Sequence, residues 1–305
     1  MKAMLRLVLA AGIYLLSACV VWAQDLGPQF RKLKDGIYVY MGTNFNSNSG
    51  IVLTQEGVVL IDSGHNPTDS RAILAAVKKL TPLPVRFLID TEPHPDHTTG
   101  HFIFSPPAVV IAHEGAAESM KARERQDPER IQKLMAVSPE MRAATEGYRF
   151  IVPNIEYGGQ KATLRLGERT FELFYLKGVH SEADTAIWLP QERVLFSASG
   201  IVVNQINILR PFVSIPDILA AAKMMKGLNP EFVIPGHGAP GTVKIFEDTE
   251  QYYALLLDRV GKRVREGQSL DQIKKEAVMP EYASWASQDR MPSNIDAAYR
   301  AIKGD

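Results

Sequence analysis

The sequence has one cysteine, no net charge and no apolar run long enough to cross a membrane. Among its 305 residues only Cys19 carries a thiol, which excludes an internal disulfide and metal sites built from several thiolates. Lys and Arg together number 34, as do Asp and Glu, and this balance argues against nucleic acid as the main partner. The apolar run at residues 7–16 is well short of the roughly 20 residues that span a bilayer. Any metal ion in the folded protein must therefore be bound by nitrogen and oxygen atoms.

The first residues have the pattern of an export signal. Two basic residues precede the apolar run, and small residues follow it. Cleavage after Ala23 would make residues 1–23 an ordinary export signal, whereas cleavage before Cys19 would make residues 1–18 a lipoprotein signal. In the second case acylated Cys19 would attach the chain to a membrane. Both forms predict an exported protein, periplasmic or secreted, and both keep Cys19 out of the chemistry of the fold.

The remainder, residues 24–305, has the composition of a single globular domain. Hydrophobic residues make up 46% of the whole chain and charged residues 22%, which is enough apolar material for a sizeable core. Short apolar runs typical of strands alternate with helical patterns in two halves. A charged segment at about 114–150 predicts a helical insertion, and the chain from about 246 to 305 is expected to be helical. The alternation predicts an α/β sandwich with functional loops at one edge of its sheets.

Four side chains that commonly bind metal ions occur on one short loop after an apolar strand pattern, in the segment Glu92-Pro93-His94-Pro95-Asp96-His97. Two imidazoles and two carboxylates gain little from such crowding unless a cation lies between them. Neutral histidine nitrogen and carboxylate oxygen are natural ligands of divalent cations. Two isolated histidines, His180 and His237, follow in turns that contain glycine. The pattern predicts a metal-dependent hydrolase.

The loop resembles the H-x-H-x-D-H motif of the metallo-β-lactamase superfamily, with Glu92 at the position of the first histidine. Other elements of the family pattern follow in the same order along the chain. Asp62 matches the aspartate after the second hairpin strand, His180 matches the histidine of the family's Gly-His-Ser/Thr segment, and His237 matches the late Gly-His pair. The resemblance covers roughly residues 36–240. It implies an αββα sandwich of the metallo-β-lactamase type.

The same resemblance implies two divalent metal ions that share a water molecule or hydroxide. The first ion would be bound by Glu92, His94 and His180. The second ion would be bound by Asp96, His97 and His237. Two such ions would lower the pKa of the shared water from about 15.7 towards neutrality and so produce a nucleophile. Asp96 would also orient this nucleophile, which makes it the predicted catalytic residue, and Asp62 would fix a ligand imidazole or the loop.

Two departures from the family pattern bear on the metal ions. Glu92 replaces an imidazole nitrogen with a harder carboxylate oxygen, so zinc is the first expectation and manganese or iron are the alternatives. The position that often carries a bridging Asp or Cys has Ser199 as its counterpart, so we expect weaker binding at the second site. His65 is expected to line the pocket. Asp184, four residues after His180, is expected to support that loop or its turn.

These residues predict an exported, metal-dependent hydrolase that acts on a small ester, lactone, thioester or amide. A zinc β-lactamase is a narrower alternative. An iron redox enzyme also stays open, as does a non-catalytic binding protein of the same fold in which Glu92 is the inactivating change. The expected partner is a small molecule and not nucleic acid. The segments expected to shape its pocket, residues 114–157 and 201–214, contain no recognition signature.

Overall fold

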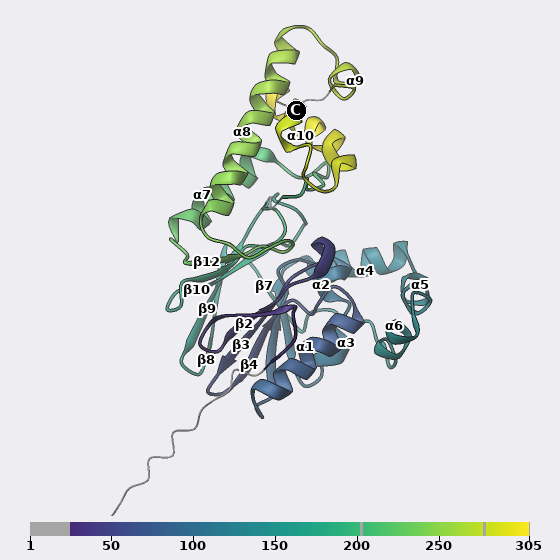
Figure 1. Ribbon diagram of the computed structural model, residues 1–305, viewed down its shortest axis with the longest axis vertical. Helices are drawn as coiled ribbons and strands as arrows, with labels where there is room; N and C mark the ends of the chain where they lie inside the picture. Colours follow the sequence, from purple (N-terminus) through teal and green to yellow (C-terminus); the bar gives the residue numbers. More distant parts are fainter. Residues whose placement is uncertain (1–24, 202–203, 277–278, 305) are drawn as a thin grey trace, which may run out of the picture.

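Two β-sheets form the centre of the computed structural model, which describes residues 25–201, 204–276 and 279–304 (Figure 1). The first sheet contains β1 (Phe30–Lys34), β2 (Ile37–Tyr40), β3 (Ser49–Thr54), β4 (Gly57–Ile61), β5 (Val85–Ile89), β6 (Val109–His113) and β7 (Ile155–Tyr157), in that spatial order. Its first four strands pair antiparallel, and β4 to β7 are parallel.

The second sheet has the spatial order β12-β11-β10-β9-β8. Its strands are β8 (Lys161–Leu166), β9 (Arg169–Tyr175), β10 (Thr185–Leu189), β11 (Val194–Phe196) and β12 (Phe232–Ile234). Only β11 and β12 pair in parallel; the other neighbours are antiparallel. The loops that carry the predicted site residues follow β4 and β5 in one sheet and β9, β11 and β12 in the other.

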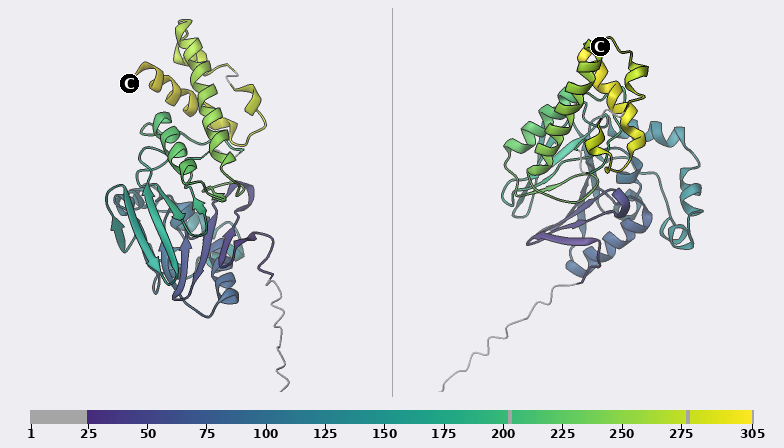
Figure 2. Two further views of the ribbon diagram at one scale, coloured as in Figure 1. Left: turned by 90° about the vertical axis from the view of Figure 1, so that its left-hand side faces the viewer. Right: turned by 45° about the horizontal axis from the view of Figure 1, so that its top comes forward.

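Helices cover the outer face of each sheet, which gives four layers (Figure 2). Helices α1 (Pro67–Leu80) and α3 (His101–Phe104) pack on the first sheet, and α7 (Ile215–Gly227) and α8 (Lys244–Arg265) pack on the second. Strand β4 shows why the layers form, since all of its residues are buried. Val59 and Ile61 belong to the core between the sheets, whereas Val58 and Leu60 belong to the core beneath α1. This αββα arrangement confirms the predicted fold class.

Helix α1 begins where the sequence predicts a helix start. The Asn66 side chain accepts a hydrogen bond from the backbone N–H of Asp69 at 3.0 Å, and Pro67 occupies the first helical position. Ser63 is held from the other side, because its backbone N–H donates to the carbonyl of His97 at 2.8 Å. The turn between β4 and α1 is therefore fixed at both ends.

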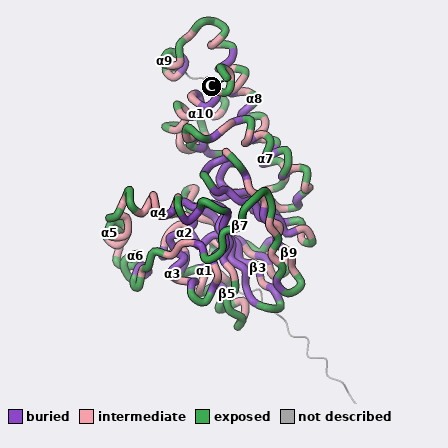
Figure 3. Tube along the Cα trace, turned by 180° about the vertical axis from the view of Figure 1, so that it is seen from behind, coloured by how far each residue is buried: buried purple, intermediate pink, exposed green. Residues whose placement is uncertain are grey.

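The segment after β6 forms three helices that stand beside the sandwich: α4 (Ala116–Gln126), α5 (Arg130–Met135) and α6 (Pro139–Ala144). Their residues are largely exposed or half-buried (Figure 3). Two arginines attach the segment to the sandwich. Arg130 Nη1 donates to Thr99 Oγ1 at 2.8 Å, and Arg71 Nε donates to the carbonyl of Ala144 at 3.2 Å. Because Thr99 follows the Glu92–His97 loop, the insertion is held close to that loop.

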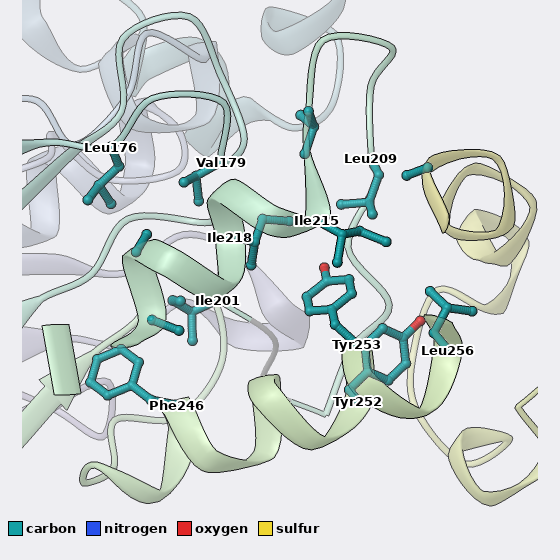
Figure 4. Close-up of a cluster of buried hydrophobic side chains, with 14 of the residues drawn as sticks. Leu176, Val179, Ile201, Leu209, Ile215, Ile218, Phe246, Tyr252, Tyr253 and Leu256 are labelled. Atoms are coloured by element: carbon teal, nitrogen blue, oxygen red, sulfur yellow. The ribbon is translucent and has the colours of Figure 1, made fainter. Parts of the chain in front are cut away.

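The C-terminal helices α8, α9 (Leu270–Ile273) and α10 (Met291–Lys303) pack with α7 over the second sheet. Figure 4 shows the apolar cluster beneath them, in which the ring of Tyr252 lies among side chains from several segments. Val179, which precedes His180, belongs to this cluster, as do Ile201 and Leu209 from the loop after β11. The helical layer therefore holds two of the loops that border the predicted site. At the start of α9 the predicted capping box is present. The Ser269 side chain accepts a hydrogen bond from the backbone N–H of Gln272, and the Gln272 side chain accepts one from the backbone N–H of Ser269.

The predicted export signal, residues 1–23 or 1–18, and Cys19 lie outside the described residues. Strand β1 was not expected from the sequence, because its exposed positions are basic and it is recognisable only by its pairing with β2. Within the described ranges, no helix combines the length and apolar character needed to cross a bilayer.

The contact between the two sheets gives a testable prediction. A Cβ atom at Gly50 in β3 would lie 2.5 Å from Cζ of Phe196 in β11, so Gly50→Ala should lower the free energy of unfolding by about 1–3 kcal/mol. The control is Gly227→Ala at the end of α7, where an added Cβ meets no atom within 4 Å. That change should be neutral or stabilise by up to about 1 kcal/mol. Urea denaturation measures both, and equal effects would contradict this account of the interface.

Candidate metal centre

Loops from both sheets meet at one edge of the sandwich. The loop after β5 carries Glu92 and His94 and leads into α2 (Pro95–Thr98), which contains Asp96 and His97. His180 follows β9, and His237 follows β12. The structure brings all six predicted metal ligands into one cluster. Whether each of them binds a metal ion stays a prediction.

Glu92 lies at the centre of this cluster. Its Oε2 atom contacts Nδ1 of His94 and lies 3.5 Å from Nε2 of His180, while Oε1 lies 3.3 Å from Nε2 of His97. Two groups therefore have ligand atoms close enough to hold one cation each. One group is Glu92, His94 and His180. The other is Glu92, His97 and His237. A single carboxylate thus belongs to both groups, whereas the sequence pattern assigned it to the first alone.

Asp96 borders the second group. Its Oδ2 atom lies 3.5 Å from Nε2 of His237, 3.7 Å from Nε2 of His97 and 3.8 Å from Nδ1 of His65. The Asp96 side chain is 32% exposed, whereas the Glu92 side chain is inaccessible to solvent. Asp96 therefore contacts the second group from the solvent side, and Glu92 contacts it from the protein interior.

Burial and charge give the ligand side chains different proton affinities. Burial alone would raise the pKa of Glu92, but the imidazoles of His97, His180 and His94 outweigh it and hold the pKa well below its usual range. Burial lowers the pKa of His180 to about 3, so its imidazole is neutral and has a free lone pair. Burial opposes protonation of His97 too, yet the carboxylates of Glu92, Asp62 and Asp96 raise its pKa well above the ordinary value. In the absence of a metal ion, a proton on His97 is the charge that balances these carboxylates.

The residues fit divalent metal ions. Within the described part of the chain, the buried Oε1 atom of Glu92 has no hydrogen-bond partner, and orphaned buried oxygens are rare in folded proteins. No Lys or Arg of that part forms an ion pair with this carboxylate. Imidazole nitrogen with carboxylate oxygen is a donor set that suits zinc, manganese and iron. A divalent ion in each group would satisfy Oε1 and supply the missing positive charge.

Hydrogen bonds orient the imidazoles of the second group. Nδ1 of His97 lies 2.9 Å from Oδ2 of Asp62, and the two Asp62 oxygens also accept from N–H and Oγ1 of Thr91 at 2.7 Å each. Nδ1 of His237 donates to the carbonyl of Phe45 at 2.8 Å. With Nδ1 hydrogen-bonded in both rings, Nε2 of each ring is the nitrogen that could bind an ion, and the two Nε2 atoms lie 3.3 Å apart. Asp62 thus contacts the imidazole of His97, one of the predicted ligands.

Asp184 organises the loop that carries His180. Its Oδ2 atom accepts hydrogen bonds from the backbone N–H of His180 at 2.6 Å and of Ser181 at 2.8 Å. Burial, together with the nearby charge of Glu92, raises the pKa of Asp184 to about 7. Ser199 lies on the opposite side of the cluster, with Oγ 3.5 Å from Nε2 of His97. Both residues therefore lie where the sequence analysis expected them, beside the ligands.

A cavity of about 550 Å³ opens onto the cluster. His94, Asp96, His180 and His237 line its base, and His65 lines it as expected. Its walls contain residues that sequence reasoning did not single out, from four separate segments: Asn44, Phe45, Arg123, Gln205, Arg210 and Arg290. The insertion and the loop at 201–214 were expected to shape this pocket. Nothing in the sequence, however, indicated that η3 (Gln288–Arg290), near the C-terminus, would reach it.

Sequence comparisons with known proteins identify relatives of this chain. The alpha subunit of 2,4-dinitroanisole O-demethylase from Nocardioides sp. (strain JS1661) is 26% identical over 183 residues, which cover 59% of this chain and 49% of that protein. A metallo-beta-lactamase type 2 from Bacillus cereus is 24% identical over 208 residues, which cover 66% of this chain and 71% of that protein.

Among solved structures, the stereoselective inverting sec-alkylsulfatase of Pseudomonas sp. superimposes with a TM-score of 0.70 at 19% identity, over 89% of this chain and 50% of that one. The chain thus spans about half the length of the demethylase subunit and of the sulfatase. At this level of identity the structural likeness shows the shared fold alone. A family model described as the metallo-beta-lactamase superfamily matches residues 42–237, a range that begins before the first candidate site loop and ends at His237. The protein therefore belongs to the metallo-beta-lactamase superfamily.

Proposed function

We propose that this protein is an exported, metal-dependent hydrolase that cleaves a small ester, lactone, thioester or amide. The observation that carries the proposal is the pair of ligand groups sharing Glu92 at the base of an open cavity. Membership of the metallo-beta-lactamase superfamily supports a metal-dependent hydrolase in general. Proteins similar to this chain have the names β-lactamase, alkylsulfatase and O-demethylase. Export, with ordinary or lipoprotein cleavage, is part of the proposal.

The chain would hold two divalent ions, with zinc as the first candidate. Glu92 would contribute to both ions, because its two oxygens contact different groups of imidazoles. When bound, such ions polarise a scissile bond and lower the pKa of a water molecule. Sharing Glu92 would compensate for Ser199, which offers no carboxylate beside the second group.

The side chains around the ions would position the reactants. Asp96 lies at the boundary between the ligand cluster and the cavity, so its Oδ2 atom can accept the proton that leaves the attacking water. Asp62 and the carbonyl of Phe45 keep the His97 and His237 rings in one orientation. Asp184 fixes the backbone of the His180 loop by accepting a hydrogen bond from the N–H of His180. These contacts would hold the ligand geometry constant during turnover, which favours catalysis through preorganisation.

Replacing Glu92 tests the proposal. Glu92→Ala should lower the bound metal below that of the wild type and reduce kcat/KM for a generic ester by at least about 100-fold, because both groups lose a ligand. Elemental analysis and an ester assay measure the two effects, with circular dichroism to verify folding. Glu247→Ala, an exposed change on α8, is the control.

Full metal content and activity in Glu92→Ala would show Glu92 to be a bystander. The alternatives have separate readouts in the wild-type protein. Turnover of ampicillin or a carbapenem would identify a β-lactamase, and bound iron with redox activity would identify a redox enzyme. Metal binding without turnover of any ester, lactone, thioester, amide or β-lactam would identify a binding protein.

A second prediction concerns Asp62. Asp62→Asn keeps the size of the side chain but weakens its hold on His97, so the affinity for the more weakly bound ion should fall by about 10- to 100-fold. Competition with a chromogenic chelator measures this affinity, and Asp248→Asn on α8, where the native side chain is 41% exposed, serves as the control. An unchanged affinity in Asp62→Asn would mean that the contact with His97 is not needed for metal binding.

A further inference from the structure

The cavity above the ligand cluster has a positively charged wall. Arg123 from α4, Arg210 from the loop after β11 and Arg290 from η3 all line it. Among the described residues that line this cavity, Asp96 is the only carboxylate. The whole chain has no net charge, so the excess of arginine is a local feature of this wall. The wall combines residues from the insertion, the loop after β11 and the C-terminal segment.

Arg210 lies closest to the predicted ions. Its Nη1 atom donates to the carbonyl of His180 at 3.0 Å and lies 3.5 Å from Nε2 of the same residue. In the described part of the chain it forms no ion pair with a carboxylate, although Glu92, Glu182 and Asp184 are near enough to attract it. Nε2 of His180 is the atom predicted to bind the first ion. A guanidinium and a divalent cation side by side repel one another unless an anion lies between them.

Arg123 is incompletely satisfied. Its Nη2 atom forms a long ion pair of 3.5 Å with Oε2 of Glu182, whose side chain is 46% exposed. Its Nε atom is buried and has no hydrogen-bond partner in the described ranges. Arg130, on the neighbouring helix, differs, because it donates to Thr99 Oγ1, Glu124 and the Tyr148 hydroxyl. Buried donors are normally paired, so Arg123 keeps hydrogen-bonding capacity that the described residues leave unused.

Arg290 completes the wall from the C-terminal side. Its Nη1 atom donates only to the carbonyl of Ile206, at 3.4 Å, and it forms no ion pair in the described part of the chain. Three guanidinium groups thus line one cavity, and within the described ranges their single ion-pair partner is the half-exposed carboxylate of Glu182. Guanidinium groups bind oxyanions through two parallel hydrogen bonds, which makes arginine the preferred residue for such groups.

We propose that the substrate is itself an anion: a hydrolysable compound with a carboxylate, sulfate or phosphate group within a few bonds of the bond that is cleaved. Arg210 and Arg123 bind that group, and Arg290 attracts it from the rim. The inference rests on the proposed function, because it names the substrate class of the same site. The charged group stays intact during the reaction. Water adds to the acyl carbon, and the bond between this carbon and the leaving atom breaks. The leaving atom takes a proton from the water.

A matched pair of esters tests the proposal. Mono-4-nitrophenyl glutarate and 4-nitrophenyl valerate have acyl chains of the same length, but only the first carries a carboxylate. After subtraction of the uncatalysed rates, the wild type should hydrolyse the glutarate ester with a kcat/KM at least about tenfold higher. Assays of 4-nitrophenyl sulfate and 4-nitrophenyl phosphate show whether the oxyanion is instead the reacting group.

Arginine variants identify the groups responsible. Arg123→Met and Arg210→Met should each lower the glutarate-to-valerate ratio about 10- to 100-fold, and Arg210→Lys should keep more of the ratio than Arg210→Met. Arg125→Met removes the same charge from an exposed position on α4 and should leave the ratio unchanged. Metal content is measured for every variant. An unchanged ratio in Arg123→Met and Arg210→Met, or equal turnover of the two esters by the wild type, overturns the proposal.

Binding measurements separate this inference from the proposed function. Calorimetry with the zinc-loaded protein should detect binding of glutarate, sulfate or phosphate, and Arg123→Met should weaken it about 10- to 100-fold. The anion that binds most tightly identifies the chemical group. Arginine-dependent binding without ester hydrolysis would contradict the hydrolase and support the anion site. Ester hydrolysis without any arginine-dependent anion binding would support the hydrolase and contradict the anion site.

Discussion

The buried carboxylate of Glu92 among imidazoles is the interaction on which the site depends. An ionised carboxylate without solvent is costly unless positive charge or hydrogen-bond donors surround it. Here His94, His97 and His180 surround it, and one of its oxygens has no hydrogen-bond partner in the described residues. The arrangement is favourable when cations lie between these groups. The glutamate that departs from the family motif therefore lies between both groups of imidazoles that could hold a metal ion.

The fold serves this arrangement by bringing the ends of distant strands to one edge. Glycine at position 50 lets the two sheets approach closely, with Phe196 of β11 against β3. The apolar layer beneath α7 and α8 then holds the segments next to His180 and Ser199. Segments outside the two sheets complete the cavity at this edge of the sandwich. They contribute Arg123, Arg210 and Arg290, which make one wall of the cavity positively charged. The sandwich thus positions the predicted ligands, and the insertion, the loop after β11 and the C-terminal segment supply the arginines that line the cavity.

Much of the cluster of candidate ligands could be predicted because its signals are local in the sequence. His94, Asp96 and His97 are neighbours on one loop, and the caps at Asn66 and Ser269 depend on residues three positions apart. The contact of Glu92 with the second group could not be predicted, since it depends on the direction of one side chain between two sheets.

The arginine wall was missed for a related reason. Arg123, Arg210 and Arg290 lie on segments with no shared pattern, and only tertiary packing brings them to one cavity. Strand β1 was missed because an exposed edge strand with basic residues has no apolar pattern of its own.

X-ray diffraction from crystals grown with zinc, recorded on either side of the zinc absorption edge, tests the central claim most directly. The account predicts two anomalous peaks at the sheet edge, with the Glu92 carboxylate in contact with both ions. A single peak, or two peaks that the Glu92 oxygens do not reach, would contradict it.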